Sequence, residues 1–467
     1  MGFIDWIKGV YVRMFNKSSA KKVFGTDAIL SDKMEEAMKL WASIIDGTPP
    51  WTDKDDDVES INFAKFLASD TAKKICLDID INITGSARAE YLQQIINRLK
   101  KVLRDKVEDA AGSAGIMFKP NGSMNINSCI DFVLAKDFLV TEKNSNGDIL
   151  GVIFFDKVTK AALSKKYYTR LEYHRFEDGL YVISNRAFVS SDKNTMGKPC
   201  SLEMVDEWKN IEPEQYIENL DKPLFAYLKM PYNNTIDMDS PLGVPVFHNA
   251  IKELKDLDIA WSRKSGEVED SKHLTYVDVS TIQYAKQNKV KLPRFMTAID
   301  MEKDEAAVRE HTATMLTESR IKDINSILSM ISTKCGYSQG QFTLDAKTGM
   351  ITATQVEADD RETIETIKDM RDVLKDCLED LVYALNAYVD LYNLAPVGEY
   401  ETSYAFGDLT YNWEEDRARH WQYVQQGKYP LWRYYVKFEG MSEDEAKAVV
   451  AEAKDEQQDK GLFEEGV

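Results

Sequence analysis

Apolar side chains recur at helical spacing over two long stretches near the middle of the chain. The first stretch begins at Ser240 and Pro241, where a serine N-cap precedes proline at the first helical position. Apolar residues then follow every three or four positions as far as Trp261, which predicts a helix over Pro241–Glu269. The second stretch predicts a helix over Asp304–Lys334. Each helix would be about 40 to 45 Å long.

A polar loop containing glycines separates the second helix from a third, which is predicted over Thr354–Tyr392. The loop has roughly 15 to 18 residues, whereas links between packed helices usually have about 2 to 8. Gly336 suits the left-handed position that ends a helix. Thr352 and Gln355 have the spacing of a capping box. A long loop held between two helices predicts a segment that binds or guides something.

Shorter stretches in the first half of the chain alternate as strands do. Helices are predicted over Met34–Ile45 and Ala89–Ala111. Asn146 and Gly147 lie between two apolar runs and predict a hairpin turn. Five strands are predicted in this region, over Gly115–Lys119, Asp131–Ala135, Ile149–Asp156, Tyr167–Arg175 and Gly179–Asn185.

The remaining predicted elements are short. Strands over His273–Ile282 and Arg294–Met301 flank a lysine-rich loop, and another strand lies within Glu399–Trp413. The last fifty residues are predicted to be helical, divided at Gly427 and Gly440, with a capping box at Ser442 and Glu445. Together these elements predict an α+β fold.

Composition narrows the possible functions. The chain has 467 residues, 43% of them hydrophobic, which is enough for more than one structural unit. Lys and Arg number 59 against 78 acids, a net charge of −19, which argues against a basic surface that grips nucleic acid or anionic membrane. Five dispersed cysteines predict a reducing compartment without disulfides. No apolar run approaches the ~20 residues that span a bilayer.

The sequence offers little candidate chemistry. Acidic clusters at Asp53–Asp57 and at Asp359 and Asp360 could suggest a metal site, but such runs are more often hydrated loops or helix starts that complement the helix dipole. Nucleotide-binding glycine motifs and a nucleophile elbow are both missing from the sequence. We therefore expect no catalytic residue, metal or cofactor. The lysines at 286, 289 and 291 are either a solvated loop tip or a contact to phosphate or to an acidic partner.

Four stretches carry a family resemblance. They are KLWASIIDGTPPW (Lys39–Trp51), PLGVPVFHNAIKELKDLDIAWSRKSGEVE (Pro241–Glu269), GYSQGQFTLDAKTGMITATQVEADD (Gly336–Asp360) and QQGKYPLWRYYVKFEGMSEDEAKAVVAE (Gln425–Glu452). They resemble the portal proteins of tailed bacteriophages, in particular siphophages of Gram-positive hosts. The third stretch is the most specific, because it resembles a family loop that leads into a TAT-[EQ]-V helix start.

The resemblance implies a portal fold. Its parts would be a mixed α/β wing at 1–235, a first stem helix at 236–271, a small α/β clip at 272–303, a second stem helix at 304–335, a tunnel loop at 336–352, a kinked helix with a return to the wing at 353–412, and a helical crown at 413–467.

The resemblance also implies a function and partners. Such portals form a homo-oligomeric ring, usually a dodecamer, at one vertex of the capsid. The ring is a head–tail connector and a channel that conducts double-stranded DNA during packaging and genome ejection. It docks the terminase large subunit and later a head–tail adaptor, and it contacts major capsid and scaffolding proteins. The protein would be assembled in the bacterial cytoplasm and end in the virion, with no membrane contact.

Residue roles follow from the resemblance in the same way. The residues that would face DNA in the tunnel loop are Gln341, Thr343, Asp345, Lys347 and Thr348. The cap between loop and helix would be Thr352, Thr354 and Gln355, and the clip contacts would be Lys286, Lys289 and Lys291. An acidic channel wall would let DNA slide, because its phosphates would meet no row of lysines.

Two other classes of protein stay open. One is a metal-dependent nucleic-acid enzyme that uses carboxylates such as Asp359 and Asp360. The other is a capsid or tail structural protein without DNA contact. A stable ring would favour the portal over the enzyme. Shortening Tyr337–Ile351 would separate the portal from a structural protein, because only a portal should still assemble heads while DNA packaging fails.

Overall fold

The computed structural model describes residues 18–52, 58–121, 123, 125–161, 165–270, 274–278, 282–284, 287–288, 296–299, 308–311, 317–344, 360–407, 409 and 413–452. Helices form 46% and strands 20% of the chain, and several sheets are antiparallel, so the predicted α+β class is confirmed. The chain forms two compact units. One comprises Met1–Gly349 and Asp359–Phe406, and the other comprises Met350–Ala358 and Gly407–Val467.

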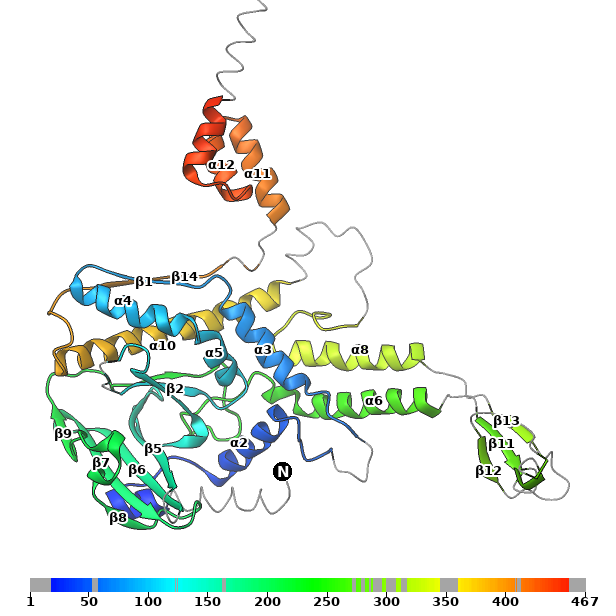
Figure 1. The fold of residues 1–467 in the computed structure, drawn as a ribbon, viewed down its shortest axis with the longest axis horizontal. Helices are drawn as coiled ribbons and strands as arrows, with labels where there is room; N and C mark the ends of the chain where they lie inside the picture. The colour runs from blue at the N-terminus through cyan, green and yellow to red at the C-terminus, as the bar shows by residue number, and fades with distance from the viewer. Residues whose placement is uncertain are drawn as a thin grey trace, which may run out of the picture. The chain divides into compact units, whose positions relative to one another are not determined.

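A six-stranded antiparallel sheet forms one layer of the first unit (Figure 1). The hairpin turn predicted at Asn146 and Gly147 is confirmed, since Gly147 has a φ of 88° and joins two paired strands. The sheet order is β4-β5-β6-β7-β8, with β9 also paired to β7. The strands are β4 (Phe138–Lys143), β5 (Ile149–Ala161), β6 (Lys165–Glu177), β7 (Leu180–Ser190), β8 (Lys198–Cys200) and β9 (Glu214–Ile217).

A second sheet and a long helix complete the core. The sheet has the order β10-β2-β3, from Ala226–Leu228, Ile116–Pro120 and Ile130–Leu134. Helix α10 (Arg361–Leu391) packs on β2 and β10. Near its end, Ala384 and Tyr388 of α10 also join a cluster with Tyr181 and Ile183 of the six-stranded sheet. The helix therefore connects the cores of both sheets.

The prediction of a single helix over Ala89–Ala111 is wrong. It is two helices, α4 (Ala87–Lys100) and α5 (Leu103–Ala111), which are separated by a turn. The amide of Val102 donates to the carbonyl of Leu99, three residues back, at 2.9 Å, so the helical pattern is interrupted there. The chain turns because α4 packs on β1, whereas α5 packs on α3.

Three further elements precede α4 in the chain. Helix α2 (Asp32–Ile45) agrees with its prediction. Helix α3 (Phe63–Ile75) and strand β1 (Asp80–Thr84) were not among the predicted elements. Strand β1 pairs with β14 (Glu401–Ala405), which lies within the stretch where the sequence predicts a strand.

The first long helix begins later than predicted. Helix α6 spans Ile251–Asp270, after a short 3-10 turn at His248–Ala250. The segment before it is buried but not helical, because its backbone bonds go elsewhere: the amides of Gly243 and Val246 donate to Ala114 and Ala111 at 2.9 Å. Apolar spacing in this segment reflects burial against α5. Ser240 accepts a bond from the amide of Leu242 and caps no helix.

The second long helix is also shorter than predicted. Helix α8 spans Thr317–Lys334, and Val308–His311 forms strand β13 instead of helix. Strand β13 pairs antiparallel with β11 (Leu274–Asp278), which takes up the backbone bonds that a helix would use. The third strand of this small sheet, β12 (Met296–Ile299), runs parallel to β11. The strands predicted in this region are thus confirmed, though they are shorter than expected.

The second unit contains three helices among its described residues. They are α11 (Trp413–Gln425), α12 (Leu431–Phe438) and residues 443–452. The predicted divisions at Gly427 and Gly440 are confirmed, since these residues have φ values of 69° and 70°. The predicted capping box is confirmed as well: the amide of Ser442 donates to Glu445 Oε2 at 3.0 Å, and the amide of Glu445 donates to Ser442 Oγ at 3.3 Å.

Arg88 of α4 is bonded to Asn386 of α10 and to the residues that follow this helix. Its guanidinium is buried and donates to the carbonyls of Ala395 and Pro396 and to Asn386 Oδ1, at 2.8 to 3.0 Å. We expect Arg88→Met to lower the free energy of unfolding by about 2 to 4 kcal/mol, because it leaves buried acceptors unpaired. Urea denaturation followed by circular dichroism measures this change.

The same substitution at Arg98 is the control for Arg88→Met, since Arg98 is exposed on the same helix. We expect a change of about 0.5 kcal/mol or less for Arg98→Met. Equal effects of the two substitutions would show that the buried contacts of Arg88 contribute nothing.

Candidate functional site

Helices α6 and α8 lie side by side (Figure 1). Lys334 at the end of α8 forms an ion pair with Glu253 near the start of α6, at 2.7 Å, so the two helices are antiparallel. Buried side chains on both helices form the apolar faces of the pair, namely Leu254 and Leu257 on α6 and Ile324, Leu328 and Ile331 on α8.

A buried carboxylate fastens α6 to the rest of the unit. Asp258 accepts hydrogen bonds from the indole of Trp51 at 2.9 Å and from the amide of Ile61 at 3.0 Å. Burial raises the pKa of Asp258, although these bonds to the carboxylate oppose the shift. Two of the stretches that carry the family resemblance therefore meet here, since Trp51 belongs to one and Asp258 to another.

The loop after α8 begins at a well-formed helix end. The amide of Gly336 donates to Thr333 at 3.2 Å and that of Tyr337 to Ser332 at 2.8 Å, which is the Schellman pattern. Gly336 has a φ of 74°, and a Cβ there would lie 2.7 Å from the hydroxyl of Thr366. Both the left-handed backbone and the lack of space require glycine. The predicted role of Gly336 is confirmed.

The first part of the loop packs on α3 instead of projecting from the body. Tyr337 is fully buried, and its hydroxyl is hydrogen-bonded to Thr71. The ring of Phe342 meets those of Phe63 and Phe66 edge-on, with centroids 5.6 and 5.9 Å apart. Lys74 lies over the Tyr337 ring, 5.6 Å from its centroid. Residues 337–344 therefore have fixed aromatic anchors.

Two polar contacts attach the same segment to the flanking helices. The amide of Ser338 donates to Thr363 Oγ1 at 2.9 Å, and the amide of Thr363 donates to Ser338 Oγ at 3.2 Å. This reciprocal pair is buried in the first turn of α10. At the other end, the amide of Leu344 donates to Asn325 Oδ1 of α8 at 2.8 Å. The loop is thus tied to α3, α8 and α10.

The structure describes only part of the predicted DNA-facing set. Gln341 and Thr343 are half-buried, and the hydroxyl of Thr343 donates to the carbonyl of Gly340 at 3.0 Å. The expected tunnel loop at 336–352 needs a correction at its start, since the side chains of Tyr337 and Ser338 are buried in the subunit. Outside the described residues lie Asp345, Lys347, Thr348, Thr352, Thr354 and Gln355.

The other candidate residues give no assembled site. The clip lysines Lys286, Lys289 and Lys291 lie outside the described residues, as do Asp53–Asp57 and Asp359. Asp360 is described and precedes α10 without making a side-chain cap bond. In the part of the chain that the structure describes, no group of three or more His, Cys, Asp or Glu side chains could hold a metal ion. Likewise, no described helix is long and apolar enough to cross a membrane.

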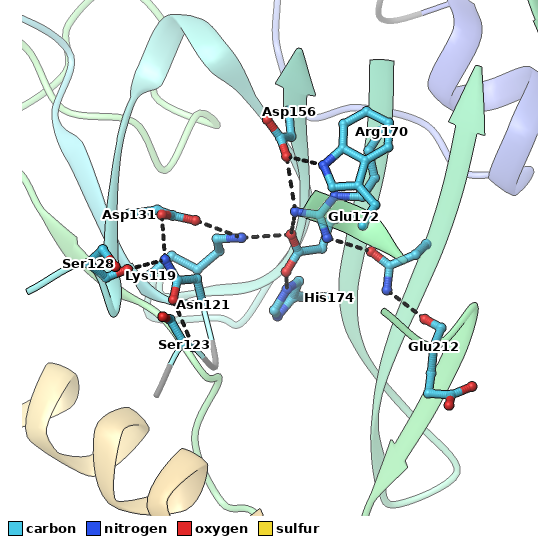
Figure 2. A network of polar contacts seen from close by, with 12 residues as sticks. Lys119, Asn121, Ser123, Ser128, Asp131, Asp156, Arg170, Glu172, His174 and Glu212 are labelled. Atoms are coloured by element: carbon cyan, nitrogen blue, oxygen red, sulfur yellow. Dashed lines mark hydrogen bonds and ion pairs between the residues drawn. The ribbon is translucent and has the colours of Figure 1, made fainter. Parts of the chain in front are cut away.

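A cluster of largely buried charged groups links the two sheets (Figure 2). Glu172 of β6 lies at its centre, 2.7 Å from Lys119 of β2, 3.1 Å from Arg170 and 2.8 Å from His174 Nε2. Arg170 also approaches Asp156 of β5 at 3.3 Å. These residues are not among the predicted site residues, although the sequence carries a signal for them in the alternation of Arg170, Glu172 and His174 on one face of β6.

The charges in this cluster compensate one another. Burial alone would raise the pKa of Glu172, but Lys119 and Arg170 hold it well below its usual range. Burial lowers the pKa of His174, so its ring stays neutral, and Nδ1 lies 2.9 Å from the hydroxyl of buried Tyr181. Lys119, Arg170, Glu172 and His174 are buried and paired, whereas the carboxylate of Asp156 is partly exposed. The cluster therefore joins β2 to the large sheet through the pair of Lys119 and Glu172.

A cavity of about 1050 Å³ opens beside β7 and β8, bordered also by residues 18–23 and 199–213. Two of its three lining cations are paired with acids, since Arg186 pairs with Glu214 at 2.6 Å and Lys209 pairs with Asp206.

Comparison with known proteins identifies no family: no protein-family model and no curated protein matches this chain. Among the predicted site residues that the structure describes, those held together lie in the loop after α8, so this loop and its contacts with α3, α8 and α10 are the candidate site.

The reciprocal bond between Ser338 and Thr363 can be tested directly. We expect Ser338→Ala to cost about 1 to 3 kcal/mol, because it leaves the buried amide of Thr363 without an acceptor. Hydrogen exchange should accelerate at residues 337–344 and in the first turn of α10. Thr343→Ala is the control, since its hydroxyl bonds only within its own turn. Unchanged exchange in Ser338→Ala would refute the anchoring role.

The buried cluster predicts a dependence of stability on pH. Unfolded histidine binds a proton below a pH of about 6.5, whereas buried His174 resists protonation because burial lowers its pKa. The free energy of unfolding should therefore fall as the pH drops through about 6.5. Glu172, with its lowered pKa, adds a further loss below a pH of about 4.3.

We expect His174→Gln to flatten the dependence between pH 7 and 5 by up to about 1.4 kcal/mol per pH unit. Urea denaturation at a series of pH values measures this slope. Burial also lowers the pKa of His248, so part of the slope should remain. A slope identical to that of the unchanged protein would contradict the assignment.

Proposed function

We propose that this chain is a portal protein, the subunit of a ring-shaped DNA channel at one vertex of a bacteriophage capsid. In this proposal the ring, of about twelve subunits, conducts double-stranded DNA during packaging and ejection and has no catalytic activity. It docks the terminase large subunit and later a head–tail adaptor, and it sits among major capsid and scaffolding proteins. Its place is the virion vertex, after assembly in the bacterial cytoplasm.

The observation that carries the proposal is the antiparallel pair of α6 and α8, followed by a loop that is anchored over residues 337–344. Helices α6 and α8 are antiparallel neighbours in space, and in sequence a small three-stranded sheet comes between them. The loop that follows α8 is anchored over residues 337–344 on α3, α8 and α10. This arrangement suits a stem, a clip and a tunnel loop, because a ring needs each copy of the loop held at the same place.

The negative net charge of the chain favours a channel that DNA passes through over a protein that grips DNA. The chain carries −19, and a ring multiplies this charge around a central axis. Phosphates moving through such a ring would be repelled by most of its surface and would find no continuous row of lysines to bind. The stretch 345–351, DAKTGMI, supplies one acid and one lysine, so its own charge is balanced.

The mass of the purified full-length chain tests the proposal most simply. We expect a closed ring of about twelve copies by light scattering and a particle with a central hole by negative-stain microscopy. The repeated interface would be head-to-tail, since only such interfaces close into rings of this kind. A monomer or a two-fold dimer at all concentrations would contradict the proposal.

Loop length tests the channel role separately from ring formation. We expect removal of residues 345–351 to leave the ring and the assembly of heads intact while DNA packaging fails, because the anchors at 337–344 remain. Replacement of the same residues by an equal number of glycines and serines is the matched control for length. Normal packaging by the shortened variant would overturn the proposal.

A further inference from the structure

The end of the β5–β6 hairpin is basic in a chain that is otherwise acidic. Residues 157–171, KVTKAALSKKYYTRL, contain five cationic side chains and no acid. The chain as a whole has 78 acids in 467 residues, about one in every six, so an acid-free stretch with this many cations is a local reversal of charge. A positive patch on an acidic protein marks a surface for a negatively charged partner.

The lysines at this end lie on a regular ladder. Strands β5 and β6 pair without interruption from Val152 and His174 to Ala161 and Lys165. The last pair of β6 with β7 joins Tyr167 to Ser190, so Lys165 and Lys166 lie beyond the end of β7. The buried contacts of Arg170 with Asp156 and Glu172 hold the base of the hairpin. Rigid strands therefore present the lysines at defined positions.

Two of these lysines oppose each other directly. Lys160 and Lys166 are cross-strand partners, so their side chains leave the same face of the hairpin. Like charges at directly opposite positions destabilise a sheet. Lys160 is partly compensated, since it bonds the carbonyl of Met204 at 2.9 Å and lies 3.4 Å from Asp206. An anion between the two side chains would remove the remaining repulsion.

Cations also occupy the opposite face. Ala161 pairs with Lys165, and Lys157 pairs with Thr169. Because side chains alternate between the two faces of a strand, Lys157 and Lys165 lie on one face, and Lys160 and Lys166 lie on the other. Within the described residues Lys157, Lys165 and Lys166 are exposed and form no ion pair. The paired residues 157–161 and 165–169 therefore form a two-stranded ribbon with positive charge on both faces.

We propose that the paired residues 157–161 and 165–169 of the β5–β6 hairpin bind the phosphate backbone of double-stranded DNA. A two-stranded ribbon fits the major groove, which is about 12 Å wide, and the phosphates of the two strands line both sides of that groove. Cations on both faces of the ribbon match these two rows, whereas the acidic surface of a protein or a membrane would meet only one face. This inference does not rest on the portal proposal.

The binding is expected to be weak and independent of base sequence. Lysines act as point charges on phosphate and read no base edges in the manner of a bidentate arginine. Four contacts, from Lys157, Lys160, Lys165 and Lys166, would give a slope of about −3.6 for log K against log salt concentration. Because the chain carries −19, we expect dissociation constants in the non-specific range, about 10⁻⁴ to 10⁻⁶ M.

The test uses the full-length chain and a fluorescent DNA duplex of about 30 base pairs, with anisotropy measured between about 50 and 200 mM salt. The test variant changes Lys157, Lys165 and Lys166 to Gln, since these lysines are exposed and unpaired. We expect its affinity to drop at least tenfold at the lowest salt and its slope to become shallower by about 2.7.

The matched control changes Lys65, Lys101 and Lys136 to Gln, three exposed lysines elsewhere in the same unit. It alters the net charge by the same amount and should bind DNA as the unchanged protein does. Equal losses in both variants would overturn the inference, because total charge alone would then explain binding. No binding by the unchanged protein would also overturn it.

Ring formation is measured on the same samples, so the two proposals can fail separately. A ring that binds no DNA through the hairpin would leave the portal proposal standing and overturn the inference. A monomer that binds DNA through these lysines would do the reverse. If the test variant lost its ring and the unchanged ring bound no DNA, the hairpin would contact a neighbouring subunit, and the inference would be wrong.

Discussion

The burial of α10 is the constraint on which the rest of the first unit depends. One face of this helix, from Thr363 to Val389, is removed from solvent against both sheets and against α3 and α4. Burial of apolar surface is the main favourable term in folding, and this helix supplies much of it to several neighbours at once. Its first turn receives Ser338 and its end receives Arg88, so the loop and α4 take their positions from it.

The candidate site shows how a long loop can be made part of the core. Glycine at 336 turns the chain, and then Tyr337 and Phe342 bury their rings on α3. These contacts offset the entropy of ordering the segment, which would otherwise oppose a fixed loop. What is left after Leu344 starts from a defined point on α8. A proposed channel constriction needs this arrangement, since its radius depends on where each loop begins.

Strands β5 and β6 carry buried, paired charges near their middle and exposed lysines near their end. Near their middle, Arg170 and Glu172 are buried and compensated, and the charge acts only to join two sheets. Near their end, Lys165 and Lys166 stand in solvent with no acid beside them in sequence. The same alternation of side chains gives an internal brace in one place and an external basic ribbon in the other. Distance from the core decides between the two.

The sequence by itself determined the α+β class, the three long strands β5, β6 and β7 of the large sheet, the hairpin at Gly147, the helix end at Gly336 and the capping box at Ser442. Most of these depend on neighbours within a few residues, whereas the short strands β4, β8 and β9 were not predicted. Tertiary structure decided the rest. Helix α6 begins late because the amides of Gly243 and Val246 bond to distant carbonyls, and α8 begins late because β13 pairs with β11. Likewise Tyr337, expected at the start of a channel loop, is buried because Thr71, 266 positions earlier in the chain, meets its hydroxyl. Such long-range partners leave no periodic signal in the residues they pair with, so only the folded chain shows them.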